Sequence, residues 1–67
     1  MRIVERGGDK YVYPETQEDK TLCYNILIML GLERQAKNML KILSRSDRFY
    51  TDTQEFYTLL ESVMEEK

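Results

Sequence analysis

The sequence predicts an α+β fold in which a short N-terminal β-hairpin packs on a three-helix unit. A Gly-Gly pair between two five-residue segments predicts the β-hairpin, and three later segments carry apolar residues at helical spacing. The chain of 67 residues is 33% charged and 42% hydrophobic, which is typical of a globular protein. We expect a single domain over residues 1–67 with a thin core, because a chain this short buries little surface.

The β-hairpin is predicted over residues 2–13, with Gly7-Gly8 as its turn. Glycine readily adopts the positive φ angles that a two-residue turn needs. Such a turn places three residue pairs opposite each other: Arg6 and Asp9, Glu5 and Lys10, and Val4 and Tyr11. Two opposite-charge pairs and one pair of an aromatic with a branched residue favour this register. A β-hairpin alone is marginal in water, so we expect it to lie against the helices.

The first helix is predicted over residues 16–30. Thr16 followed by Asp19 indicates a capping box, and Gly31 is typical of the position just after a helix end. Tyr24 and Ile28 point away from the broad apolar face, so this helix should be buried on nearly all sides and lie at the centre of the fold. The broad apolar face consists of Leu22, Cys23, Ile26, Leu27, Met29 and Leu30.

Two more helices are predicted over residues 33–44 and 52–66. Thr51 with Gln54, and Asp52 with Glu55, offer two overlapping capping boxes before the last helix. The core stripe of the middle helix is expected to be Leu32, Ala36, Met39, Leu40 and Leu43. That of the last helix is expected to be Phe56, Leu59, Leu60 and Val63, with Tyr57 and Met64 at its edge.

The composition argues against catalysis. Histidine, the commonest general base and metal ligand, is absent. Cys23 is the only cysteine, and its apolar neighbours indicate a small core residue and not a reactive thiol. We therefore expect no enzyme activity, no catalytic residues, no internal disulfide, no metal site, no cofactor and no small-molecule substrate. A small domain without such staples relies on regular packing, a second subunit or a partner protein.

The sequence also predicts a cytoplasmic location without a membrane partner. Residues 1–4 run directly into Glu5 and Arg6, which does not resemble a signal peptide. The longest apolar stretch, residues 22–30, is much shorter than the about 20 residues that a membrane span needs. A single cysteine fits a reducing compartment.

The clearest polar signal is a basic stripe on the middle helix. Its cations fall within an arc of about 80° opposite the core stripe: Arg34, Lys37, Lys41 and Arg45. Residues 34–48 carry a net charge of +4 (five basic side chains against one acidic), whereas residues 49–67 carry −4 (five acidic against one basic). The stripe is either a solvated face, a surface for an acidic partner, a phosphate-contacting surface, or a surface that attracts the acidic helix of another copy.

The first two helices and the glycine between them resemble a helix-turn-helix. The match consists of Gly31, Leu32 and Leu40, whereas Leu27 and Lys37 depart from the residue types of the motif. The resemblance implies that the middle helix reads DNA with its basic stripe. The net charge of −2 argues in the other direction, because DNA-binding domains are typically basic.

We predict from these observations a small non-catalytic protein-binding module, a regulator or inhibitor that acts by protein–protein contact and self-association. The proposed partner surface is the basic stripe. Tyr24 and Ile28 are the predicted self-association residues of a homodimer, because that side of the first helix needs a cover. A small DNA-binding regulator that uses the basic stripe is the alternative.

Overall fold

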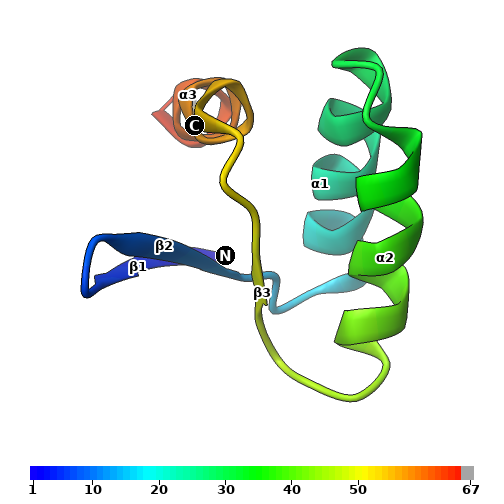
Figure 1. The fold of residues 1–67 in the computed structure, drawn as a ribbon, viewed down its shortest axis with the longest axis horizontal. Helices are drawn as coiled ribbons and strands as arrows, with labels where there is room; N and C mark the ends of the chain where they lie inside the picture. Colours follow the sequence, from blue (N-terminus) through cyan, green and yellow to red (C-terminus); the bar gives the residue numbers. More distant parts are fainter. Residues whose placement is uncertain (66–67) are drawn as a thin grey trace.

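The structure, a computed structural model, describes residues 1–65 and has an α+β fold, as predicted. Figure 1 shows α1 and α2 as neighbouring helices that run in opposite directions, while α3 is seen end-on above the β-hairpin and so crosses them. No helix within residues 1–65 has both the length and the apolar character needed to cross a membrane. The elements are β1 (Arg2–Arg6), β2 (Asp9–Tyr13), α1 (Gln17–Met29), α2 (Glu33–Leu43), β3 (Phe49–Tyr50) and α3 (Gln54–Glu65).

The β-hairpin has the predicted turn and register. Gly7 and Gly8 have φ angles of 56° and 88°, so both central residues of the turn are in the positive region that glycine allows. Arg6 pairs with Asp9, Glu5 with Lys10 and Val4 with Tyr11. The two-residue turn therefore sets the register, and the cross-strand pairs agree with it.

Both ends of α1 are formed by local hydrogen bonds that the sequence indicates. The Asp19 N–H donates to Thr16 Oγ1 over 3.1 Å, and the Thr16 N–H donates back to Asp19 Oδ2 over 3.3 Å, which completes the capping box. At the other end, Gly31 has a φ of 76°, and the Leu32 N–H donates to the Leu27 carbonyl over 2.8 Å. This is a Schellman motif, and it turns the chain directly into α2.

The ends of the other two helices differ slightly from the prediction. α2 ends at Leu43, with Ser44 as its C-cap. α3 begins at Gln54, two residues later than predicted. The Thr51 hydroxyl donates to Gln35 Oε1 of α2, and its oxygen accepts from the N–H of Thr53, the residue before the helix, over 3.4 Å. The predicted capping boxes of Thr51 with Gln54 and of Asp52 with Glu55 are therefore wrong, because neither Thr51 nor Asp52 is the residue directly before the helix. Glu66, the predicted last residue of this helix, lies outside the described residues.

The third strand, β3, is not in the sequence-based prediction. It adds to β2 in antiparallel orientation, with Tyr50 opposite Tyr11 and Phe49 opposite Val12, so the sheet order is β1-β2-β3. The Tyr11 and Tyr50 rings lie 5.7 Å apart between centroids, and Phe49 is buried against Phe56 of α3. Cross-strand and core contacts of these aromatic side chains stabilise β3. The strand is too short to show the alternation of apolar and polar residues by which a strand is predicted from sequence.

One hydrophobic core is shared by the sheet and all three helices. Its buried side chains are Val12, Cys23, Ile26, Leu27, Ala36, Met39, Phe49, Phe56, Tyr57 and Leu60. α1 packs against both α2 and α3, in agreement with the central place predicted for it. It is not covered on all sides, however: Met29, placed by the prediction on its apolar face, is 77% exposed at the last turn.

Tyr57 connects three parts of the fold. It is buried, although the prediction placed it at the edge of the core stripe, and Leu59 is 36% exposed instead. Its hydroxyl donates to the Lys10 carbonyl of β2 and accepts from the Thr51 N–H over 3.3 Å. Burial raises the pKa of Tyr57, although the hydrogen bond from Thr51 acts in the opposite direction. The hydrogen bonds of its hydroxyl explain why the sheet side of α3 favours a tyrosine here.

Candidate functional site

The basic stripe lies on the solvent side of α2. Ala36 and Met39 are buried on the opposite side of this helix, so the phase predicted for the cations is correct. Arg34, Lys37 and Lys41 are exposed on the helix itself. Arg45 is also exposed, but it lies in the turn that follows the end of α2 at Leu43. The stripe therefore has three helical cations and one at its C-terminal end.

These cations have no acidic partner within residues 1–65. The described ion pairs of side chains elsewhere include Lys10 with Glu61 over 3.4 Å and Arg2 with Glu15 over 3.5 Å. Arg48, which the sequence places near the stripe, instead lies 3.9 Å from Asp47 and 5.8 Å from the Tyr11 ring centroid. The positive charge of α2 is therefore compensated by solvent alone among the described contacts, and it is available to another molecule.

An apolar flank accompanies the stripe on the side of α1. Leu40, predicted to be at the centre of the core stripe, is 47% exposed, and that prediction is wrong. Leu40 lies on the edge of α2 nearest α1, where it lines a shallow hollow of about 200 Å³ together with Tyr24 and Thr21. Ile28, one helical turn beyond Tyr24, is 36% exposed. The β-hairpin does not cover these side chains.

The predicted self-association residues of α1 and part of the basic stripe of α2 thus form a single surface, which we call the helix-pair face. It consists of Tyr24, Ile28, Lys37, Leu40 and Lys41. Spacings of three and four residues put Lys37, Leu40 and Lys41 next to one another on α2. Leu40 and Tyr24 share a hollow, which joins the self-association residues of α1 to the basic stripe of α2. The sequence reasoning missed this link, because it assigned Leu40 to the core.

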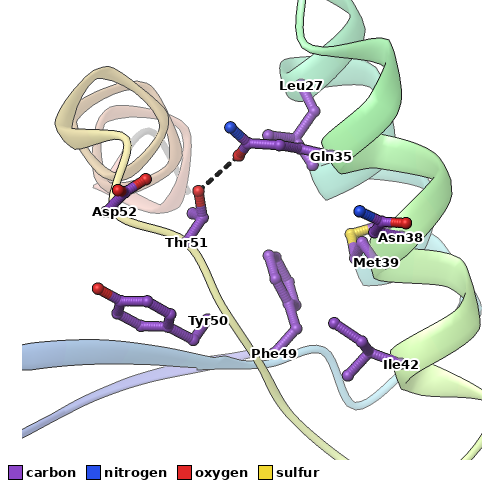
Figure 2. A pocket seen from close by; sticks show the side chains of 9 residues that line it. All are labelled: Leu27, Gln35, Asn38, Met39, Ile42, Phe49, Tyr50, Thr51 and Asp52. Carbon is purple, nitrogen blue, oxygen red and sulfur yellow. Dashed lines mark hydrogen bonds between the residues drawn. The ribbon is translucent and has the colours of Figure 1, made fainter.

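A second hollow lies on the other flank of α2. It has a volume of about 270 Å³ and lies between α2, β3 and the segment that leads to α3 (Figure 2). The Thr51 hydroxyl donates to Gln35 Oε1 over 2.6 Å across this hollow, and the half-exposed Ile42 stands at its side. The hydrogen bond ties α2 to the start of α3 and closes part of the opening.

Neither a metal-binding cluster nor an exposed thiol is found among the described residues. No cluster of three His, Cys, Asp or Glu side chains within residues 1–65 could hold a metal ion. Cys23 is fully buried, as expected, and burial together with the charge of Asp19 raises the pKa of its thiol to about 12. A protonated thiol in the core is a poor nucleophile. The helix-pair face offers charge and apolar area, which serve binding.

The arrangement of α1 and α2 also bears on the resemblance to a helix-turn-helix. The helices of that motif cross at about 90–120°. α1 and α2 instead run in opposite directions along each other, as in an αα-hairpin (Figure 1). The likeness is therefore confined to the turn at Gly31, and DNA binding stays a prediction.

Comparison with known proteins gives no relative from which a role could be taken. No protein-family model matches the chain, and no curated protein and no solved structure is significantly similar to it.

Proposed function

We propose that this protein is a binding module for another protein and that the helix-pair face receives the partner. The observation that carries the proposal is Leu40, 47% exposed between two lysines that have no ion-pair partner within residues 1–65. An exposed leucine next to a tyrosine and two free cations combines apolar contact area with charge. Such a surface fits a partner segment that carries both carboxylates and an apolar side chain.

An amphipathic acidic helix is the partner segment that best matches this face. Its apolar side chains would occupy the hollow between Tyr24 and Leu40, and its carboxylates would reach Lys37 and Lys41. This kind of binding suits a small regulator or inhibitor, because such a protein acts by covering a surface of its target. The single free cysteine is consistent with action in the cytoplasm.

Amide NMR spectra of the full chain distinguish this proposal from the DNA-binding alternative. We expect an acidic amphipathic helical peptide to shift the amide signals of Tyr24, Ile28 and Leu40 together with those of Lys37 and Lys41. Duplex DNA bound through phosphates would shift the signals of the basic stripe, including Arg34 and Arg45, and leave Tyr24 and Ile28 unchanged.

Two variants provide the matched controls for the peptide titration. Leu40→Ser should abolish the shift at Tyr24, whereas Glu18→Gln, on an exposed position of α1 away from the face, should leave it unchanged. Peptide shifts spread over the whole protein, or confined to the sheet, would contradict the proposal.

A further inference from the structure

The charges of α2 and α3 are complementary, and both point outward. α2 presents Arg34, Lys37 and Lys41 to solvent, and α3 presents Glu55 and Glu65. Each helix also carries a partly exposed leucine: Leu40 lies next to Lys37 and Lys41 on α2, and Leu59 lies one turn after Glu55 on α3. The two surfaces therefore offer each other opposite charges and apolar contacts.

These surfaces cannot meet within one molecule. No Cα atom of α2 lies within 8 Å of one in α3 over residues 1–65, and the two helices occupy separate parts of the fold (Figure 1). The segment from β3 to Asp52 and the hydrogen bond between Thr51 and Gln35 hold them in that relation. The charge complementarity is available only between different copies of the chain.

We infer that this protein associates with itself head to tail, with α3 of one copy lying on the helix-pair face of the next. The inference rests on the proposed function, since it names a second copy of this chain as an acidic segment that the face accepts. α2 and α3 have 11 and 12 residues, or about 16 and 18 Å in length, so the two faces match in extent.

When the two faces of one copy bind two different neighbours, the contact is heterologous and leads to a chain of copies and not to a two-fold dimer. Each added copy leaves one free basic face and one free acidic face. A two-fold dimer through Tyr24 and Ile28 would instead bring Lys37 and Lys41 of both copies close together, and their like charges would repel each other. Charge therefore favours the head-to-tail arrangement.

Sedimentation of the full chain over a range of concentrations tests this inference. One helix-on-helix contact is small, so association should be weak and visible from about 0.1 mM to about 1 mM. At low salt, the weight-average mass should rise continuously above the 8.0 kDa of the monomer. At about 0.5 M salt it should return to the monomer value, because exposed charges are screened there.

Charge reversal identifies the two surfaces. Lys37→Glu with Lys41→Glu, and separately Glu55→Lys with Glu65→Lys, should each weaken self-association by about tenfold or more, and a mixture of the two variants should restore it. Arg6→Glu with Arg48→Glu has the same net charge as the first variant but leaves both faces intact. It should associate within about twofold of the unmodified protein. Thermal unfolding of each variant checks that it is folded.

The outcomes separate this inference from the proposed function. A mass of 8.0 kDa at every concentration, with an acidic peptide still shifting the helix-pair face, would overturn the head-to-tail contact and leave the binding module standing. A discrete dimer that neither salt nor Lys37→Glu with Lys41→Glu weakens would also overturn it, in favour of a two-fold interface at Tyr24 and Ile28.

Discussion

α2 and α3 are similar in length and both amphipathic, yet the residues near the edge of their apolar stripes differ in burial. On α2, Leu40 belongs to the apolar stripe by its position, but it is half exposed. On α3, Tyr57 lies at the edge of the stripe, but it is buried and holds two hydrogen bonds. The charged sides differ as well, since Glu61 of α3 pairs with Lys10 while the cations of α2 are unpaired within residues 1–65.

This difference shows that the burial of a side chain at the edge of an apolar stripe depends on which other segment packs against that edge. At the Tyr57 edge of α3, the hydroxyl donates to the Lys10 carbonyl of β2 and accepts from the N–H of Thr51, the residue after β3. Beyond the Leu40 edge of α2, side chains of α1 surround an open hollow and leave Leu40 half exposed. A covered edge stabilises the fold, whereas an uncovered edge remains free for another molecule.

The largest effect should come from the covered side of α3. Leu60 is fully buried, so Leu60→Ala should cost about 2–5 kcal/mol of unfolding free energy through lost burial and a cavity. A domain of this size has about 3–5 kcal/mol in total, so we expect this variant to be largely unfolded at body temperature. Urea titration followed by circular dichroism measures the change. A stable Leu60→Ala variant would mean that α3 contributes little to the core.

The hydrogen bonds at the Tyr57 edge should have the next largest effect. Tyr57→Phe leaves the Lys10 carbonyl and the Thr51 N–H without their partner, which should cost about 1–3 kcal/mol. Tyr50→Phe is the matched control, because this ring is half exposed at the sheet edge, and its cost should stay within about 0.5 kcal/mol. Equal effects of the two changes in thermal unfolding would contradict the role of the Tyr57 hydroxyl.

Alkaline pH should lower the stability of the fold, because the buried thiol of Cys23 in α1 ionises less readily than in the unfolded chain. The thiol of Cys23 has a pKa of about 12 in the fold against an ordinary value of 9.0, so the unfolded chain releases this proton first as pH rises. Stability from this group is therefore complete below pH 9.0 and falls above it, by about 1.4 kcal/mol for each pH unit up to about 12. Urea midpoints at pH values on both sides of 9.0 measure the fall.

Cys23→Ala is the control for this pH effect. The variant loses stability at every pH because a core side chain is shortened, but its further decrease above pH 9.0 should be smaller than that of the unmodified protein. An identical decrease in both proteins would show that tyrosine ionisation alone accounts for the alkaline unfolding.

The smallest effects should be found on the uncovered side of α2. Leu40→Ala should cost about 1 kcal/mol, because about half of this side chain is already in water. Lys41→Ala should change stability by no more than about 0.5 kcal/mol. Both changes should nevertheless weaken binding of an acidic amphipathic peptide in a fluorescence titration. If Leu40→Ala unfolds the protein as readily as Leu60→Ala does, the two helix edges do not differ in the way described.

Local chemistry in the sequence determined much of the fold. The Gly7-Gly8 turn sets the register of the β-hairpin, the Thr16–Asp19 capping box starts α1, and the Schellman motif at Gly31 ends it. The outward position of the basic stripe on α2 follows from helical spacing alone. Each of these features depends on residues within one or two turns of each other, so the sequence is sufficient to predict it.

Only the tertiary structure decided the rest. β3 is too short to show an alternation, and it exists because Phe49 and Tyr50 pack against α3 and β2. The Thr51 hydroxyl donates to Gln35 of α2, Tyr57 is buried and Leu40 is exposed. The helix-pair face therefore could not be predicted as one surface. The physical reason is that burial depends on which distant segments reach a side chain, and helical periodicity describes only the element on which that side chain lies.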